Sequence, residues 1–235
     1  MQRAINAVEE MDRPDCDPLL LERTYAQFPL VNRFVSGWRQ VYVALIRPAL
    51  PRNRTGTILD IGCGGGDITR NLFRWATADG FDVRVVGIDP DARAHDYAVR
   101  SAAKAGIDPT LLEFRRAASS ELVSRGERFD VVVSNHVLHH LGPVELAGVF
   151  ADTERLARTL AIHSDIRRRR SALVFFGLAT LPLDRSSYIR RDGLTSIRRS
   201  FTADELSRVV RPEWHVYSPG LYRNLAVWHA PAALP

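Results

Sequence analysis

The sequence predicts an α/β fold in which a doubly wound, mostly parallel β-sheet is covered by helices on both faces. Three observations support this prediction. An apolar run at 58–61 stops at a glycine-rich turn before a helical pattern, and apolar runs at 83–88 and 129–133 each end in polar residues. Short apolar runs bounded by turn residues are typical of buried strands, and their alternation with helices indicates βαβ units. Ligands of such sheets bind at the carboxyl ends of the strands.

The glycine-rich turn reads Ile58-Leu59-Asp60-Ile61-Gly62-Cys63-Gly64-Gly65-Gly66-Asp67. Glycine allows positive φ angles and a close approach of a ligand to the backbone. The helical pattern that follows extends to Gly80, a candidate cap. A dinucleotide fingerprint G-x-G-x-x-G would need a third glycine at position 67, where Asp67 would repel a pyrophosphate. A nicotinamide-dependent oxidoreductase is therefore a disfavoured alternative.

The D-x-G-x-G-x-G spacing of Asp60, Gly62, Gly64 and Gly66 resembles motif I of the class I S-adenosylmethionine (SAM)-dependent methyltransferases. The cofactor of that family carries a cationic sulfonium and an amino-acid end, so acidic residues around the loop make electrostatic sense. The phrase F-D-V-V-x-S-N-x-x-L-H-H-L at 129–141 is similar to motif IV of the same family. The resemblance covers 58–141 and implies a Rossmann-like, seven-stranded, mostly parallel sheet with an antiparallel last strand. It also implies SAM as cofactor and S-adenosylhomocysteine as product.

The carboxyl ends of the later strands carry further candidate cofactor contacts. A carboxylate after the second strand can accept hydrogen bonds from ribose hydroxyls, so Asp89 is the predicted ribose ligand and Asp91 a helix cap. Many family members have an acidic residue after the third strand, at 111–116, to bind adenine. Alanines stand there in this chain, so backbone and apolar contacts are expected instead. The predicted cofactor-binding residues are Asp60, Gly62, Cys63, Gly64, Asp89, Pro90, Ala117, Ala118, Asn135, Trp38 and Arg39.

Residues 1–53 precede the first strand and are predicted to form a helical cap on a SAM-binding domain at 54–235. Two helices are expected, at 19–28 and 31–50, separated by Pro29. In small-molecule methyltransferases such a cap commonly closes over cofactor and substrate. Candidate contacts are therefore Tyr25, Arg33, Trp38 and Arg39. Plain packing or a solvated face is the alternative for each of them.

The segment at about 166–200 follows the predicted fifth strand, where the resembling family places a substrate lid. An apolar helix within 171–183 could wall a pocket. The arginines of the insert could receive an acidic or carrier-bound substrate, or could simply form a solvated face. A capping box at 202–205 predicts a last helix to position 210. An antiparallel hairpin at 214–217 and 222–229 then closes the sheet.

Methyl transfer from SAM is an in-line displacement, so the protein must mainly align the reactants and exclude water. A phenol or enol acceptor also loses a proton, and a histidine titrates near neutral pH. His139 and His140 follow the fourth strand, and Asp165 ends the neighbouring fifth strand. These three residues are the predicted catalytic group. The alternative is that one histidine only packs or lines the pocket.

Composition limits the remaining classes. The 235 residues suffice for one sizeable core, and 46% hydrophobic with 25% charged residues is ordinary for a globular protein. Residues 1–15 contain no apolar signal sequence, and the run at 171–183 is too short to span a bilayer. Cys16 and Cys63 lack metal-ligand spacing, so no zinc site, no disulfide and a cytoplasmic location are expected. The net charge of +5 reflects an arginine bias that hints at a GC-rich bacterial source, and no nucleic-acid partner is expected.

The residues together predict a bacterial enzyme that methylates an O or C atom of a small aromatic, quinone-like or polyketide acceptor, as a monomer or homodimer. The lid and tail loosely resemble enzymes of quinone and secondary metabolism. Enzymes that methylate exocyclic amines of nucleic-acid bases usually carry an N/D-P-P-Y/F/W tetrad, and Ser134-Asn135-His136-Val137 differs from it. A SAM-fold or RNA-associated binding protein without turnover is the non-enzyme alternative.

Overall fold

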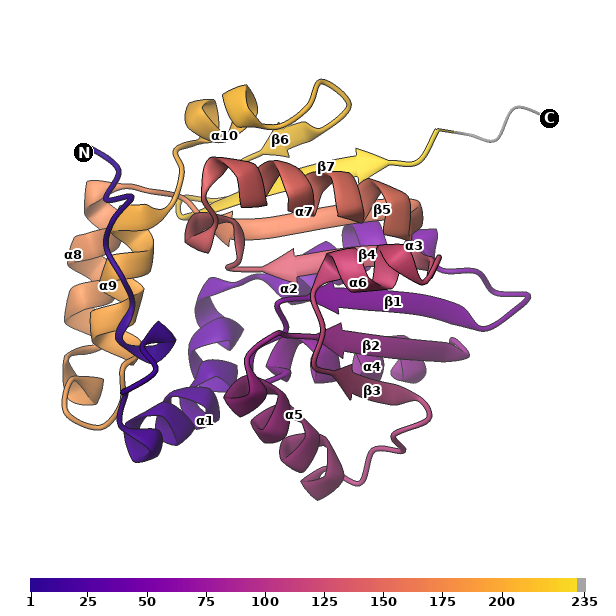
Figure 1. Ribbon diagram of the computed structural model, residues 1–235, viewed down its shortest axis with the longest axis horizontal. Coiled ribbons are helices and arrows are strands. Elements are labelled where there is room, and N and C mark those ends of the chain that lie inside the picture. Colours follow the sequence, from indigo (N-terminus) through magenta and orange to yellow (C-terminus); the bar gives the residue numbers. More distant parts are fainter. Residues whose placement is uncertain (232–235) are drawn as a thin grey trace.

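The computed structural model describes residues 1–231, without the side chains of 33–35. Seven strands form one sheet in the order β3-β2-β1-β4-β5-β7-β6 (Figure 1). All neighbouring strands are parallel except at β7, which runs antiparallel to β5 and β6. The strands are β1 Gly56–Ile61, β2 Val83–Ile88, β3 Leu112–Arg115, β4 Phe129–Asn135, β5 Ala157–Ile166, β6 His215–Tyr217 and β7 Arg223–His229. The predicted mostly parallel sheet with an antiparallel last strand is confirmed.

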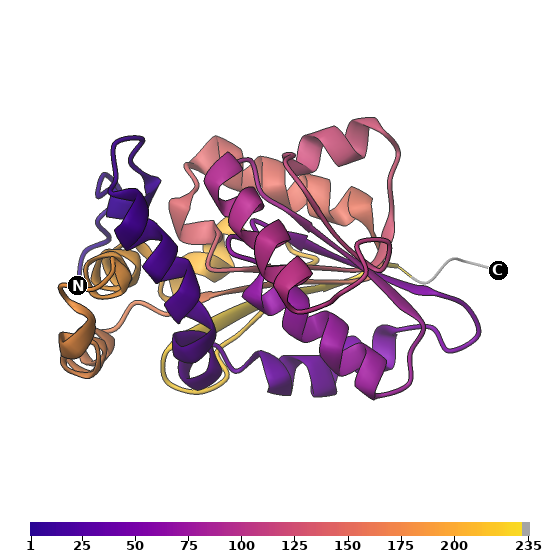
Figure 2. The same cartoon turned by 90° about the horizontal axis from the view of Figure 1, so that it is seen from below.

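Helices cover both faces of this sheet (Figure 2). Each face has its own apolar core. One face carries α2 Trp38–Val41, the π-helical η2 Tyr42–Ile46, α3 Arg47–Ala49, α4 Asp67–Ala78 and α5 Ala92–Lys104. The other carries α6 Ser119–Ser124, α7 Pro143–Leu156 and α10 Ala203–Val209. Neighbouring strand residues point to opposite faces, so Ile58 joins the first core while Leu59 joins the second. Continuous apolar strands are therefore buried on both sides.

The N-terminal region differs from its prediction. The first helix, α1 Pro18–Val35, runs through Pro29 instead of ending there. The break lies at Gly37, whose φ of 58° is left-handed and lets the chain turn into α2. The following residues do not form a separate layer, because Trp38, Tyr42 and Ile46 are part of the core between the sheet and α4. The side chain of Arg33, a predicted contact, lies outside the described residues.

The predicted lid consists of two helices. The apolar one, α8 Arg170–Ala179, matches the expectation, and the 3₁₀ turns η3 Leu138–His140 and η4 Leu181–Leu183 are short connections. The second helix, α9 Ile189–Arg199, occupies a polar stretch for which no helix was predicted, because only one side of it is buried.

The N-terminal residues lie against α9, so segments far apart in the sequence meet beyond the carboxyl ends of the parallel strands (Figures 1 and 2). Asp192 accepts hydrogen bonds from the backbone nitrogens of Glu10 and Met11 at 2.7 and 3.0 Å. These residues belong to the 3₁₀ turn η1 Glu10–Asp12. Helices α8 and α9, the N-terminal turn and α1 therefore lie together at the carboxyl ends of the parallel strands (Figure 1). Among the described helices, none has the length and apolar character to cross a bilayer.

Candidate functional site

A cavity of about 650 Å³ opens at the carboxyl ends of the strands, between the glycine loop after β1, the end of β4, and helices α1, α8 and α9. Most of the predicted site residues line it: Asp60, Gly62, Cys63, Gly64, Asp89, Pro90, Asn135, His139, His140 and Asp165. Tyr25 lines it as well, as expected of the cap. The cavity falls within the size range of small-molecule sites.

The glycine loop has the conformation that its sequence predicts. Gly62, Gly64 and Gly66 have φ angles of 66°, 52° and 72°. A Cβ on Gly62 would lie 2.5 Å from a methyl carbon of Val137, so a side chain is excluded by contact as well as by φ. A Cβ on Gly64 would meet no atom within 4 Å, which leaves this part of the loop open to the cavity.

Asp89 fixes the loop from the end of β2. Its Oδ2 accepts a hydrogen bond from the Gly64 nitrogen at 2.9 Å, and its Oδ1 accepts one from the Asp91 nitrogen at 2.9 Å. Each carboxylate oxygen can accept more than one bond, so Asp89 retains acceptor capacity toward the cavity. Asp91 caps α5 by accepting from the Arg93 nitrogen, as predicted.

Three carboxylates surround the loop: Asp60 and Asp67 are buried, and Asp89 is half-buried. Burial, together with the negative charges of Asp67 and Asp89, raises the pKa of Asp60 to about 7. Its Oδ2 accepts from the Thr69 hydroxyl at 2.7 Å, whereas its buried Oδ1 has no hydrogen-bond partner among the described residues. A cationic ligand would supply the missing partner and compensate the charge. These carboxylate acceptors thus fit the ammonium and sulfonium groups of a SAM-like molecule.

Two residues that support this loop were missed by inspection of the sequence. Asn32 of α1 donates to Asp67 Oδ2 at 2.9 Å, and Arg70 of α4 donates to the Gly65 carbonyl at 2.8 Å. Arg70 is only five residues from its partner Gly65 in the sequence. Asn32, however, is 35 residues distant from its partner, and no local pattern indicates such a contact.

Four predicted cofactor residues do not line the cavity. Trp38 is 1% exposed and donates its indole N–H to Asn135 Oδ1 at 2.8 Å, so it supports a cavity residue from behind. Arg39 is exposed and stacks over the rings of Tyr42 and Trp75. The other two predicted cofactor residues follow β3. Ala117 is buried in the core, and Ala118 is the residue before α6.

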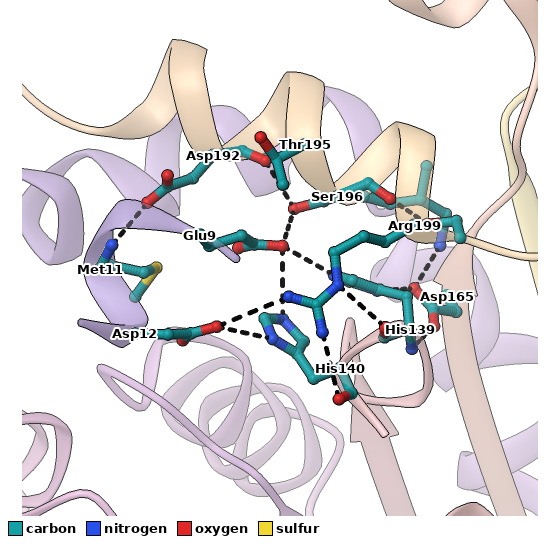
Figure 3. A network of polar contacts seen from close by, with 12 residues as sticks. Glu9, Met11, Asp12, His139, His140, Asp165, Asp192, Thr195, Ser196 and Arg199 are labelled. Carbon is teal, nitrogen blue, oxygen red and sulfur yellow. Dashed lines mark hydrogen bonds and ion pairs between the residues drawn. The ribbon is translucent and has the colours of Figure 1, made fainter. Parts of the chain in front are cut away.

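The predicted histidine–carboxylate pair is present. The Nδ1 of His139 lies 2.7 Å from Asp165 Oδ1, and its backbone N–H donates to Asp165 Oδ2 at 2.9 Å (Figure 3). On the other side of the ring, Nε2 lies 3.3 Å from Oε1 of Glu9. Burial opposes the charged ring, but the carboxylates of Asp165 and Glu9 outweigh it and raise the pKa of His139 to about 9.

Glu9 is the most informative residue that sequence inspection missed. It lies in the polar N-terminal stretch, yet it is 3% exposed and accepts from the Ser196 hydroxyl of α9 at 2.7 Å. The second histidine, His140, places Nε2 3.7 Å from the same Glu9 Oε1 and Nδ1 3.0 Å from Asp12 Oδ2. The N-terminal turn therefore brings two carboxylates to the predicted histidines.

His136 is a further cavity residue that was not predicted. Its backbone is left-handed, with φ of 59°, because its N–H donates to the Ser164 carbonyl at 2.8 Å as the chain leaves β4. Desolvation lowers the pKa of His136 to about 4, so its ring is neutral at pH 7. An uncharged imidazole at the cavity wall can either donate or accept a hydrogen bond.

The rest of the cavity wall is largely apolar and comes from α1, the lid and the hairpin before β7. The lining side chains there are Phe28, Val31, Ile166, Ala172, Phe175, Phe176, Ala179, Ile189, Ile197 and Tyr222. Acidic residues, glycines and imidazoles line the sheet side of the same cavity. This polarity suits a charged cofactor beside an apolar acceptor.

A family model described as a methyltransferase domain matches residues 58–159. Similar proteins include ubiquinone biosynthesis O-methyltransferases of Rhizobium etli and Azorhizobium caulinodans, which are 34% and 39% identical over 89 residues. The alignments cover 38% of this chain and 32% of each relative. The chain thus spans about a third of the length of the curated relatives that it matches.

Solved structures with the same fold include a plantazolicin methyltransferase in complex with a monoazolic desmethylPZN analogue and S-adenosylhomocysteine. It has a TM-score of 0.63 and 14% identity, and the match covers 93% of this chain and 91% of that one. A magnesium protoporphyrin IX methyltransferase from Synechocystis with bound SAM has a TM-score of 0.54 and 15% identity, covering 93% and 100%. The matched domain, the strand order and the glycine loop agree, so residues 58–159 match a methyltransferase domain and the sheet around them has the fold of the SAM-dependent methyltransferases.

Proposed function

We propose that this protein is an enzyme that transfers the methyl group of SAM to an O or C atom of a small, largely apolar acceptor of the aromatic, quinone-like or polyketide type. The observation that carries the proposal is the composition of one cavity. Its sheet side presents the glycine loop with Asp60 and Asp89, and its outer side is apolar. Imidazoles and carboxylates line the same space.

The acidic loop residues would hold the cofactor. Asp60 Oδ1 would accept from the cofactor's ammonium, and Asp89 would accept from the ribose hydroxyls while it keeps its bond to the Gly64 nitrogen. Adenine would lie near Pro90 and the end of β3, against backbone and apolar groups. SAM supplies an activated methyl group, so these residues have only to fix its position relative to the acceptor.

The histidine cluster would handle the hydroxyl of the acceptor. Asp165 orients the ring of His139, and Glu9 stabilises positive charge on its other side. The half-buried His140, whose Nδ1 is bound by Asp12, is the candidate to take the proton.

The lid would select the acceptor. Phe175 of α8 and Tyr222 before β7 have ring centroids 6.4 Å apart, and both line the cavity. A planar apolar acceptor would pack between the lid and α1, which fits the names of the ubiquinone relatives. We also propose a cytoplasmic protein, monomeric or dimeric, that acts on a free or carrier-bound small molecule and not on nucleic acid.

Thermal unfolding with SAM, S-adenosylhomocysteine, NAD or NADP tests the cofactor. A ligand at a hundredfold its dissociation constant stabilises the folded state by about 2.7 kcal/mol, and only the two adenosyl ligands should do so. An Asp89→Ala variant should lose the shift, whereas an exposed Asp96→Ala variant should keep it. A shift with nicotinamide cofactors alone would contradict the proposal.

Labelled methyl transfer then tests the acceptor class. We expect the label to move from SAM to a hydroxylated quinone or phenol with an apolar substituent, and we expect Phe176→Ala on the cavity wall to raise KM for it. Transfer only to RNA or protein, or none to any acceptor while SAM binds, would refute the proposed acceptor class. In the latter case the chain would be a SAM-binding protein without turnover.

A further inference from the structure

Three potential metal ligands converge where the N-terminal turn meets the end of β4. They are Oε1 of Glu9, Nε2 of His139 and Nε2 of His140, which all lie within 4.8 Å of one another (Figure 3). The glutamate oxygen is 3.3 Å from the first nitrogen and 3.7 Å from the second. Donors on a tetrahedral zinc ion with bonds of about 2.0–2.1 Å are about 3.3–3.4 Å apart. The two distances from Glu9 are therefore close to those of a metal site, and the three donors have to approach one another only slightly to bind one ion.

The outer nitrogens of both rings are bound by carboxylates. Nδ1 of His139 is 2.7 Å from Asp165, and Nδ1 of His140 is 3.0 Å from Asp12. Metal-binding histidines almost always donate their other N–H in this way, since the bond fixes the tautomer and orients the ring. The Ser196 hydroxyl, at 2.7 Å, likewise orients the Glu9 carboxylate.

This arrangement leaves lone pairs facing one another. With hydrogens on both Nδ1 atoms, each Nε2 presents a lone pair toward the same carboxylate oxygen. The Nε2 of His139 is buried and has no hydrogen-bond partner with acceptable geometry among the described residues. Either a proton on His139 or a metal cation must lie between these acceptors. A single proton on His139 can serve one contact only, whereas a metal ion would serve all three donors.

The surrounding charges favour a cation. Three carboxylates, those of Glu9, Asp12 and Asp165, surround the histidines, and the guanidinium of Arg199 compensates only one of these negative charges. Arg199 donates to the His139 carbonyl at 3.3 Å and lies 3.9 Å from Asp12. All three proposed ligands also line the cavity, so a fourth coordination position would face it. Structural sites are closed by four protein ligands, but sites with three ligands and an open position bind a small molecule.

We propose that Glu9, His139 and His140 form a site for one divalent transition-metal ion of the zinc type. Two imidazoles and one carboxylate are a donor set for Zn²⁺, Co²⁺ or Fe²⁺ rather than for Mg²⁺ or Ca²⁺. At the open position the ion would bind the acceptor oxygen and lower the pKa of its hydroxyl, so that the proton leaves to solvent and His140, then a ligand, does not have to take it. This role rests on the proposed function. Binding of the ion itself does not. No motif in the sequence indicates the site, because Glu9 lies far from both histidines along the chain.

Titration of chelator-stripped protein with Co²⁺ and Zn²⁺ tests the site. Wild-type protein should bind one equivalent, and Co²⁺ should show the visible absorption of a tetrahedral complex. Asp12→Asn should weaken binding about 10–100-fold, as expected for a residue that orients a ligand. Glu9→Gln and His140→Ala should weaken it at least as much. The matched control is His215→Ala on exposed β6, which should bind like wild type.

Unfolding of each variant in chelator shows whether it is folded, and the same samples are tested for stabilisation by SAM. Equal metal binding by all variants, or none by folded wild-type protein, would overturn the metal site and leave a shared proton between Glu9 and His139. If SAM binds and metal does not, only the metal site is wrong. If metal binds at the predicted ligands and SAM does not, only the proposed function is wrong.

Discussion

Replacing Asp60 with asparagine should make the protein without cofactor more stable and its SAM complex weaker. The carboxylate is 1% exposed, and burial with two neighbouring carboxylates raises its pKa from 3.8 to about 7. The folded state therefore binds the proton more tightly than the unfolded chain does. Stability must fall as the pH rises from about 4 to about 7, and the full cost is present above pH 7.

The size of the effect follows from the shift. About three pKa units at 1.36 kcal/mol each amount to about 4 kcal/mol at pH 8. The asparagine of the variant would keep an acceptor for the Thr69 hydroxyl, but its amide must find a partner, so about 4 kcal/mol is an upper limit. Each kcal/mol moves the Tm of a domain of this size by about 2–4 °C. Even a quarter of the effect would be measurable.

The assay is thermal unfolding at pH 5 and pH 8, with and without SAM. Asp60→Asn should exceed wild type at pH 8 by more than at pH 5, and its SAM affinity should fall about 10–100-fold, as for the loss of a charged hydrogen bond. Asp130→Asn is the matched control, because Asp130 is equally buried but Arg54 and Thr57 outweigh burial and lower its pKa. That variant should lose stability at pH 8. A destabilised Asp60→Asn at pH 8, or unchanged SAM binding, would refute the reasoning.

Three other substitutions have defined outcomes. Gly62→Ala places a methyl group 2.5 Å from Val137 and should abolish the SAM-induced Tm shift. Its control, Gly80→Ala, has a φ of 78° but open space around the added Cβ, so it should only lower the Tm. Equal effects of the two variants on the SAM-induced shift would contradict the contact argument. Trp38→Phe loses one hydrogen bond, so urea unfolding should show a loss of about 1 kcal/mol, and no loss would mean that the bond is not formed. Burial lowers the pKa of His163 to about 3, so stability should fall as the pH drops below about 6.5, and His163→Phe should flatten this limb; an unchanged slope would rule out the assignment.

The glycine loop and the two strands beside it could be predicted because their information is local. Gly62, Gly64 and Gly66 adopt left-handed angles that other residues avoid, and an apolar strand before them and a helix after them leave few alternatives. Asp89 was predicted as a ribose ligand, and the structure adds that it fixes the loop through the Gly64 nitrogen. That cofactor role stays a prediction.

The N-terminal region and the lid could be predicted only in part. Pro29 was expected to end a helix, but packing of α1 beside α9 and α5 maintains the helix through it. The polar α9 has no strong local signal, since its buried side is formed by residues such as Ile189 and Ile197 only after it meets the N-terminal turn. Trp38 and Arg39 were assigned to the cofactor from their place in the cap, and the structure turns both of them away from the cavity.

Local patterns along the chain suffice to predict the α/β class and the cofactor loop. The pairing of His139 with Asp165 could also be predicted, because the two residues follow or end adjacent parallel strands, β4 and β5. What faces the other side of that histidine ring depends on tertiary packing. Glu9 and Asp12 reach the histidines because Asp192 of α9 holds the N-terminal turn in place. Contacts between residues so distant in sequence depend on packing of whole elements, and no periodicity or spacing along the chain encodes them.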